Sequence, residues 1–357
     1  MPQHPYVAIM AGGVGSRFWP ASRESRPKQF LDILGTGVSL IRQTYARFAR
    51  ITAPERILVV TNAAYRGLVA EQLPELPAGN ILCEPSRNNT APSVAYTALH
   101  VEARDPEASL VIAPSDHVIL LEDAFVAAIE TAVGFAERRH GLVTLGIEPT
   151  RPDTGYGYIE YDAEPAAAGV HAVRAFREKP DRATAEAYLD AGGYVWNAGI
   201  FVWRVRDILE AFREHSPQIY ETLTARRDCF GTDREDGFIA EAYPRTESIS
   251  VDYAIMERAG NVYTIPCEIG WSDLGTWGSL HAFATKDERA NVVHGDNTVV
   301  VDASNNLIRT HDGKLVVIRG LEDFIVVDEE DVLMVYPKSK EQEIKQLTQS
   351  LGNANFL

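Results

Sequence analysis

The sequence is poor in cysteine, in basic charge and in long hydrophobic runs, and each deficit excludes a class of protein. Its three cysteines, Cys83, Cys229 and Cys267, have no paired spacing, which argues against a disulfide framework and a zinc knuckle. A formal net charge of -16 argues against a general nucleic-acid binder, because such binding depends on basic patches that displace counterions. Any phosphate ligand must therefore be met by local cations.

Membrane insertion and secretion are also not expected. No apolar run approaches the length of a membrane span, and the opening MPQHPYVAIM lacks the basic and apolar regions of a signal peptide. We therefore expect no membrane partner and a location in the cytoplasm, where the scattered cysteines would stay reduced.

Short β-rich runs alternate with helical stretches over residues 1–150. The runs are YVAIM, RILVVT, NILCEP, SLVIAP and GLVTLGI. This alternation predicts an α/β fold with a mostly parallel sheet covered on both faces, in which ligands bind beyond the carboxyl ends of the strands. Further strands and helices over residues 151–285 continue the same domain.

The pattern changes after about residue 288 to apolar pulses such as NTVVVDA, KLVVIRG and DVLMVYP. Such pulses predict a small β-solenoid-like unit. A closing helix is expected in KSKEQEIKQLTQSLGN, because Ile344, Leu347 and Leu351 recur at helical spacing. The sequence thus predicts a Rossmann-like domain over residues 1–288 and a β domain over residues 289–357.

The segment MAGGVGSRFWPASRESRPKQF, residues 10–30, joins three glycines to a run of cations directly after the first strand. It matches neither familiar phosphate loop, because Phe18 replaces the third glycine of G-x-G-x-x-G and no G-x-x-x-x-G-K-[ST] occurs. A tight turn would explain the glycines alone. It would not need Arg17 and Lys28, which can add charge-assisted bonds to phosphate oxygens.

This loop resembles the signature of the sugar-1-phosphate nucleotidylyltransferases, and its Trp-Pro and Pro-Lys-Gln-Phe details are most similar to the mannose-1-phosphate guanylyltransferase branch. Further segments follow in the family's order: EPSRNNTAP, PSDH, GYGYIE, FREKP, WNAGIFVW and GWSDLGTW. The resemblance implies a nucleotidyltransferase that makes GDP-mannose and pyrophosphate from GTP and α-D-mannose 1-phosphate. Longer relatives carry an isomerase domain beyond the β tail, so we expect no isomerase activity here.

The resemblance also implies the nucleotide site. Arg17 and Lys28 would be the catalytic cations on the triphosphate. The implied binding residues are Ala11, Gly12, Gly13, Gly15, Ser16, Glu84, Pro85, Ser86, Arg87, Asn89, Pro114 and Asp116. The segment beginning at Glu84 is assigned to guanine, although a helix cap at Thr90 also explains its polar residues.

A metal site and a sugar site complete these expectations. Asp116 and Asp273 are the implied ligands of Mg²⁺, which takes one or two carboxylates, phosphate oxygens and water. Either aspartate taken alone is more simply a helix cap or a turn residue. The residues implied for the sugar phosphate are Gly157, Glu178, Lys179, Asn197 and Asp252. Simpler explanations remain open: a strand bulge for Gly157, a surface ion pair for Glu178 and Lys179, and a helix start for Asp252. His117 receives no role.

The expected partners are GTP, mannose 1-phosphate and GDP-mannose, and a homodimer is left open. A sugar phosphate is already largely ionised at neutral pH, so the missing Ser-His-Asp set does not count against an enzyme. Alternatives are a different base, another sugar phosphate such as a manno-heptose, or a non-catalytic sugar-nucleotide-sensing subunit. We also expect Arg17 and Lys28 to face solvent until phosphate arrives.

Overall fold

The computed structural model describes residues 4–311, 313–352 and 356, which fall into two compact units. Unit 1 contains the chain up to Gly12, together with Tyr45–Ser115 and Ile119–Trp271. Unit 2 contains Gly13–Thr44, Asp116–Val118 and the chain from Ser272 onward. Across the described part of the chain, every helix is too short or too polar to span a membrane.

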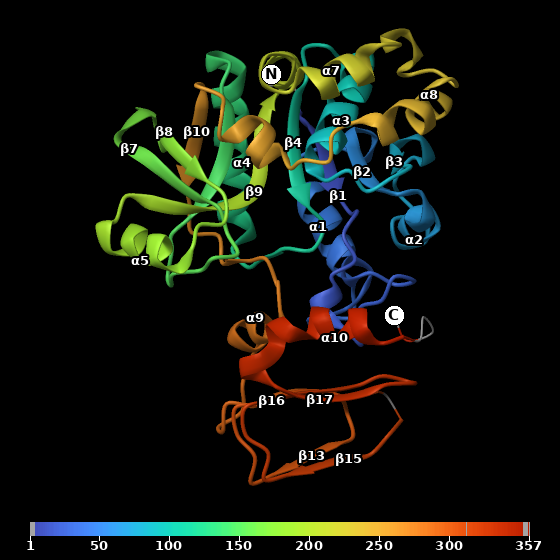
Figure 1. The fold of residues 1–357 in the computed structure, drawn as a ribbon, viewed down its shortest axis with the longest axis vertical. Helices are drawn as coiled ribbons and strands as arrows, with labels where there is room; N and C mark the ends of the chain where they lie inside the picture. Colours follow the sequence, from blue (N-terminus) through green and yellow to red (C-terminus); the bar gives the residue numbers. More distant parts are fainter. Residues whose placement is uncertain (1–3, 312, 353–355, 357) are drawn as a thin grey trace. The chain divides into compact units, whose positions relative to one another are not determined.

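Unit 1 is built on one nine-stranded sheet (Figure 1). The strand order is β3-β2-β1-β4-β9-β6-β10-β8-β7, and all strands except β8 and β9 run in one direction. The predicted mostly parallel sheet is therefore confirmed. The strands are β1 (Tyr6–Met10), β2 (Ile57–Asn62), β3 (Ile81–Glu84), β4 (Ser109–Pro114), β6 (Leu142–Ile147), β7 (Tyr158–Ala167), β8 (Val170–Arg177), β9 (Tyr194–Arg204) and β10 (Val262–Pro266).

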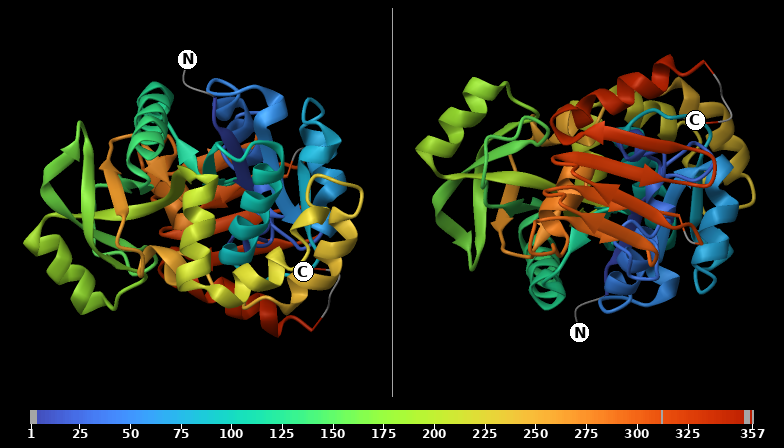
Figure 2. Two further views of the ribbon diagram at one scale, coloured as in Figure 1. Left: turned by 90° about the horizontal axis from the view of Figure 1, so that it is seen from above. Right: turned by 90° about the horizontal axis from the view of Figure 1, so that it is seen from below.

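Helices cover both faces of this sheet, with α4 on one face and α3 and α6 on the other (Figure 2). Coverage on both sides explains why β1 and β4 are nearly continuous apolar runs. The helices are α2 (Arg66–Gln72), α3 (Thr90–Arg104), α4 (Glu122–Arg139), α5 (Arg182–Ala191), α6 (Val205–His215), α7 (Pro217–Thr224) and α8 (Glu235–Ala242). Three elements contain residues of both units: helix α1 (Leu40–Phe48) and the short strands β5 (Val118–Ile119) and β11 (Trp271–Ser272).

Unit 2 contains a parallel β-solenoid, which confirms the predicted β domain. One sheet has the order β12-β14-β16-β17, with only β17 antiparallel to its neighbour, and a second sheet pairs β13 with β15. The strands are β12 (Val292–His294), β13 (Thr298–Val301), β14 (Leu307–Arg309), β15 (Val316–Arg319), β16 (Phe324–Asp328) and β17 (Leu333–Pro337). The predicted closing helix is also present, as the 3₁₀ turn η9 (Lys338–Glu343) followed by α10 (Ile344–Ser350).

The core of unit 2 joins the glycine loop to the solenoid. Phe18 of the loop is fully buried, in one cluster with Trp277 of α9 (Trp277–Phe283), Ile325 of β16 and Ile344 of α10. The loop thus belongs by its contacts to the same unit as the solenoid. The sequence-based boundary at residue 288 stays a prediction.

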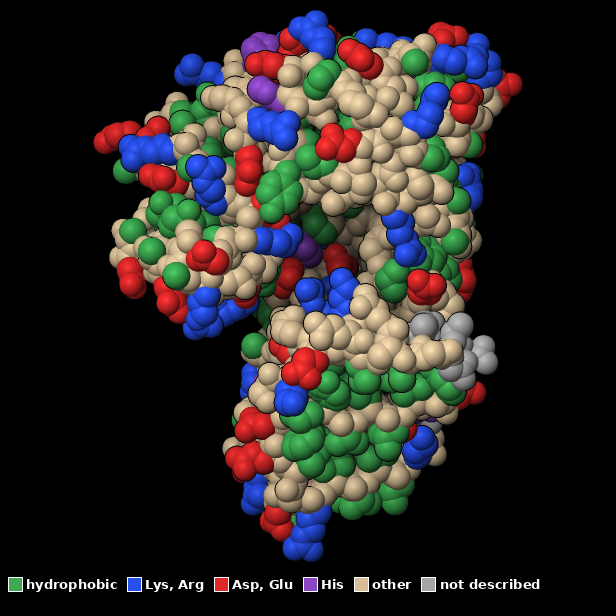
Figure 3. All heavy atoms as spheres, in the orientation of Figure 1, with side chains coloured by type: hydrophobic (Ala, Val, Ile, Leu, Met, Phe, Trp, Pro, Cys, Tyr) green, Lys and Arg blue, Asp and Glu red, His purple; other side chains and the backbone are tan. Residues whose placement is uncertain are grey.

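Hydrophobic side chains also gather on the outside of the solenoid (Figure 3). Most of them lie on β13, β15 and β17, on the faces of these strands that are not packed in the core. The exposed residues are Val299, Val301, Leu315, Val317, Leu333 and Val335.

Candidate functional site

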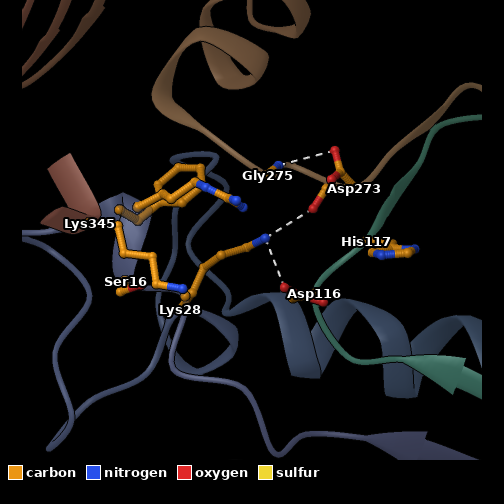
Figure 4. A pocket seen from close by; sticks show the side chains of 10 residues that line it. Ser16, Lys28, Asp116, His117, Asp273, Gly275 and Lys345 are labelled. Carbon is orange, nitrogen blue, oxygen red and sulfur yellow. Dashed lines mark hydrogen bonds and ion pairs between the residues drawn. The ribbon is translucent and has the colours of Figure 1, made fainter. Parts of the chain in front are cut away.

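A cavity of about 310 Å³ lies within unit 2 beside the glycine loop (Figure 4). Its walls come from four separate stretches of the chain. The lining residues are Gly15, Ser16, Arg17, Phe18, Lys28, Asp116, His117, Asp273, Gly275 and Lys345. The fold therefore brings together both predicted catalytic cations, both predicted metal ligands and part of the predicted phosphate loop.

The glycine loop is held in a fixed shape by its own backbone. Gly15 has a positive φ of 75°, and a Cβ there would lie 2.5 Å from the Cβ of Lys28, so only glycine fits. The Val14 carbonyl accepts hydrogen bonds from the Lys28 N–H at 3.1 Å and from the Ser22 hydroxyl at 2.5 Å. These bonds fold residues 13–30 back on themselves and set the cavity wall.

Lys28 is buried, with 3% of its surface exposed, which corrects the expectation that it faces solvent. Its Nζ forms an ion pair with Asp116 at 2.8 Å and donates to the carbonyls of Asp273 at 3.0 Å and Leu274 at 2.7 Å. The ammonium also lies 5.2 Å from the centre of the Phe18 ring. The local motif gave no sign of this burial, because the partners come from chain segments far from the loop. Arg17 is exposed, as expected.

The two aspartates present hard oxygen ligands to the same cavity. Desolvation opposes ionisation of Asp116, but the Lys28 ammonium, His117 and a backbone hydrogen bond together hold the pKa of that carboxyl below its ordinary value. Asp273 Oδ1 accepts a hydrogen bond from the Gly275 N–H at 3.1 Å, which orients the second carboxylate. No three His, Cys, Asp or Glu side chains of the described residues group to form a complete metal site. A divalent metal here would need phosphate oxygens and water as further ligands.

Two lining residues with ionisable side chains were not assigned a role from the sequence. His117 follows Asp116 directly, and Lys345 comes from α10 at the far end of the chain. A lone lysine in a polar helix carries no motif, so sequence patterns offered no signal for Lys345.

Glu84, the residue predicted to meet guanine, lies at the end of β3 in unit 1 and is 8% exposed. Its Oε1 accepts hydrogen bonds from the hydroxyls of Ser93 on α3 and Tyr243 in the turn Tyr243–Arg245. Burial raises the pKa of Glu84, and these two bonds oppose the rise. Its Oε2 points toward the Gly12 backbone, where a Cβ would lie 3.2 Å away. One carboxylate oxygen is thus fixed by two donors, and the other lies beside the end of β1.

The loop after Glu84 has an unusual backbone. Asn89, not Thr90, caps α3: its side chain accepts from the Thr90 N–H at 2.9 Å, while Thr90 Oγ1 accepts from the Val251 N–H at 2.9 Å. Asn89 has φ 67° and ψ -169°, a region that residues other than glycine rarely occupy and that occurs at ligand clamps. Asn88 Nδ2 donates to the Tyr243 carbonyl at 3.0 Å and so ties this loop to the turn that supports Glu84.

The remaining residues predicted for the nucleotide in unit 1 lie at or just beyond the ends of parallel strands. Ligands of such sheets gather at this edge. The residues are Ala11 and Gly12 after β1, Pro85, Ser86 and Arg87 after β3, and Pro114 at the end of β4.

The five residues predicted for the sugar phosphate lie together in unit 1. Asn197 Nδ2 on β9 donates to Asp252 Oδ1 at 2.9 Å, and Lys179 Nζ pairs with Glu178 Oε1 at 2.5 Å. A Cβ at Gly157 would lie 2.5 Å from Glu178 Oε2, so a side chain at position 157 would displace that carboxylate. The cluster therefore offers an ammonium, an amide and two carboxylates beside bare backbone.

Asp252 carries the most perturbed carboxyl of this cluster. Burial, and then the nearby Glu178 carboxylate, raise the pKa of Asp252 to about 6. It begins the π-helical turn η8 (Asp252–Met256), a geometry that is rare and frequent at functional sites. The predicted alternative, a simple helix start, does not explain its bond to Asn197.

Comparison with known proteins identifies two family matches. The model described as Nucleotidyl transferase matches residues 6–290. The model described as MannoseP isomerase/GMP-like beta-helix domain matches residues 296–351.

Individual relatives match nearly the whole chain. The xanthan biosynthesis protein XanB of Xanthomonas campestris pv. campestris is 38% identical, over 97% of this chain and 73% of that protein. A mannose-1-phosphate guanylyltransferase of Klebsiella pneumoniae is 37% identical, over 96% of this chain and 73% of that protein. A crystal structure from Thermus thermophilus, named as a mannose-1-phosphate geranyltransferase, matches with a TM-score of 0.88 and 31% identity, over 98% of this chain and 100% of that one.

Proposed function

Because this chain belongs to the nucleotidyl transferase family, we propose that it transfers GMP from GTP to α-D-mannose 1-phosphate, forming GDP-mannose and pyrophosphate. The mannose-1-phosphate guanylyltransferase of Klebsiella pneumoniae, matched over nearly the whole chain, supports this reaction. The proposed partners are GTP, mannose 1-phosphate and GDP-mannose. A homodimer stays a prediction.

The observation that carries the proposal is the cavity in unit 2, which combines cations with a carboxylate pair. Arg17, Lys28 and Lys345 supply three positive charges there, and Asp116 and Asp273 supply two negative ones. Local cations of this kind are what a chain of net charge -16 needs in order to hold a triphosphate. The carboxylates would exclude a bare polyanion but suit a phosphate that arrives with a divalent metal.

The reaction needs positioning and charge stabilisation more than proton transfer. The phosphate of mannose 1-phosphate is already largely ionised at neutral pH, so its oxygen can attack without a general base. In-line attack on the α-phosphorus of GTP breaks the bond to the β-phosphate, and the electron pair leaves with pyrophosphate. Arg17 and Lys28 would hold the triphosphate in place and stabilise its growing negative charge.

Mg²⁺ is the proposed metal, with Asp116 and Asp273 as its protein ligands. When bound, it would supply positive charge to the transferring and leaving phosphates. Lys28 keeps Asp116 ionised and thus ready to act as a ligand, since its ammonium lies 2.8 Å from that carboxylate.

Base and sugar selection are assigned to side chains of unit 1. The Oε2 atom of Glu84 can accept from the N1–H and 2-amino groups of guanine, whereas adenine presents an acceptor at N1 and would be rejected. Asn197 and Glu178 can bond sugar hydroxyls. Lys179 can hold the incoming phosphate as a point charge.

Pyrophosphate release tests this proposal when it is measured with the four nucleoside triphosphates and several sugar 1-phosphates, with and without Mg²⁺. We expect the highest kcat/KM for GTP with mannose 1-phosphate, and no turnover without a divalent metal. A higher kcat/KM for a manno-heptose 1-phosphate would favour that substrate instead. Release with no pair of substrates would favour a sensing subunit, which the intact loop and carboxylate pair do not favour.

A further inference from the structure

Lys345 reaches the cavity from a part of the chain that the nucleotidyl transferase model does not cover. It lies on α10, within the residues 296–351 that match the β-helix model, whereas the transferase model ends at residue 290. It nevertheless lines the cavity beside Ser16 and Arg17. The solenoid segment therefore contributes a charged side chain to a site whose other lining residues come from the transferase segment.

The position of Lys345 is fixed by its neighbours along the chain. Ile344 is fully buried in the cluster that contains Phe18 of the glycine loop and Trp277 of α9. One turn earlier, Glu341 Oε2 accepts a hydrogen bond from the Gly278 N–H at 2.6 Å, which ties η9 to the first turn of α9. These contacts hold α10 against the loop, so Lys345 is presented to the cavity by a packed element.

The charge of Lys345 is available to a ligand. Within the described ranges, the side chains of Lys345 and Arg17 have no hydrogen-bond or ion-pair partner, whereas Lys28 is engaged with Asp116 and two carbonyls. Figure 4 shows Lys345 and Ser16 toward one end of the cavity and Asp116, Asp273 and His117 toward the other, with Lys28 between them. The unengaged Lys345 thus lies away from the carboxylate pair.

We propose that Lys345 binds the β- and γ-phosphates of GTP and the pyrophosphate formed from them, so that the solenoid segment completes the phosphate site. This inference rests on the proposed function. The metal and the reacting α-phosphorus would lie at the end of the cavity with Asp116 and Asp273. The β- and γ-phosphates, which leave as pyrophosphate, would then lie at the end with Lys345. A lysine suits this task because its compact charge on a flexible stem can follow a phosphate group as it departs.

The test compares Lys345→Gln and Lys345→Arg with Lys340→Gln, a matched change at an exposed lysine of η9 that does not line the cavity. In the reverse reaction, Lys345→Gln should raise the KM for pyrophosphate about tenfold, as expected for loss of a charge-assisted bond. The KM for GDP-mannose should change little, and all melting curves should match wild type. Lys345→Arg should recover most of the loss, because it keeps the charge.

Equal changes in both KM values, or the same effect from Lys340→Gln, would overturn the assignment. Direct titration with pyrophosphate and Mg²⁺ separates this inference from the proposed function, because it requires no turnover. Wild type that binds pyrophosphate no better than Lys345→Gln contradicts the role of Lys345. Wild type that binds pyrophosphate tightly but forms no GDP-mannose contradicts the proposed function and leaves the phosphate-binding role standing.

Discussion

Asp252→Asn should stabilise the protein at neutral pH and leave it nearly unchanged in acid. The pKa of Asp252 is raised from 3.8 to about 6 by burial and by the Glu178 carboxylate. A carboxyl whose folded pKa lies above its unfolded pKa stabilises the fold below the unfolded value, and this contribution is lost as pH rises through the folded value. Asparagine removes the charge of this half-buried side chain and keeps an oxygen that can accept from Asn197 Nδ2.

The size of the effect follows from the size of the shift. About two pKa units correspond to about 3 kcal/mol, which is the upper limit of the expected gain in unfolding free energy. Urea denaturation of wild type and variant between about pH 4 and about pH 8 measures it, and the difference should grow over the interval from 3.8 to about 6. The variant should also lose activity, because Asp252 belongs to the proposed sugar site.

Asp181→Asn is the matched control with the opposite sign. The pKa of Asp181 is lowered by hydrogen bonds from Thr184, whose N–H donates to it at 2.8 Å at the start of α5. Its stabilising contribution is present above the unfolded pKa and lost as pH falls, so its substitution should destabilise the protein at neutral pH rather than stabilise it. A pH-independent difference for Asp252→Asn, or the same sign for both variants, would refute the reasoning.

Three further predictions concern the cavity and Glu84, the proposed guanine-binding residue. Lys28→Ala should abolish turnover and lower the melting temperature, because it removes the buried ammonium that pairs with the Asp116 carboxylate. Arg17 is exposed, so Arg17→Ala should lower turnover and leave the melting temperature unchanged. A normal rate in both variants would remove the loop from the mechanism. Asp273→Asn should raise the Mg²⁺ concentration needed for half-maximal rate and be partly rescued by more Mg²⁺, and an unchanged half-saturation would show that this carboxylate is not a ligand. Tyr243→Phe should cost about 2 kcal/mol of unfolding free energy in wild type and much less in Glu84→Gln; equal costs would mean that the hydroxyl does not act through Glu84.

Local sequence was enough to predict the features that one short segment encodes. The glycine loop is one continuous segment, residues 10–30, which contains both the glycines that form its turn and its cations. Strand and helix periodicity likewise predicted the parallel sheet and the solenoid, because alternation and apolar pulses follow directly from which faces are buried. Asp116 and Asp273 reach one cavity as the resemblance implied, although nothing in their spacing required it.

Features that depend on distant segments could not be predicted. The buried ammonium of Lys28 is held by carbonyls that lie more than 240 positions further along the chain than Lys28 itself. The fixed orientation of Glu84 requires the Tyr243 hydroxyl. Lys345 reaches the cavity only because Ile344 is buried beside the loop. Propensity and spacing describe single elements, whereas these contacts are made by tertiary packing.

The most direct test of the central claim follows a radiolabel through the reaction of GTP with mannose 1-phosphate in the presence of Mg²⁺. Attack on the α-phosphorus predicts that label at the α-position appears in GDP-mannose and that label at the γ-position appears only in pyrophosphate. Transfer of the γ-label to the sugar product, or release of the α-label as free GMP without a labelled sugar nucleotide, would contradict the account.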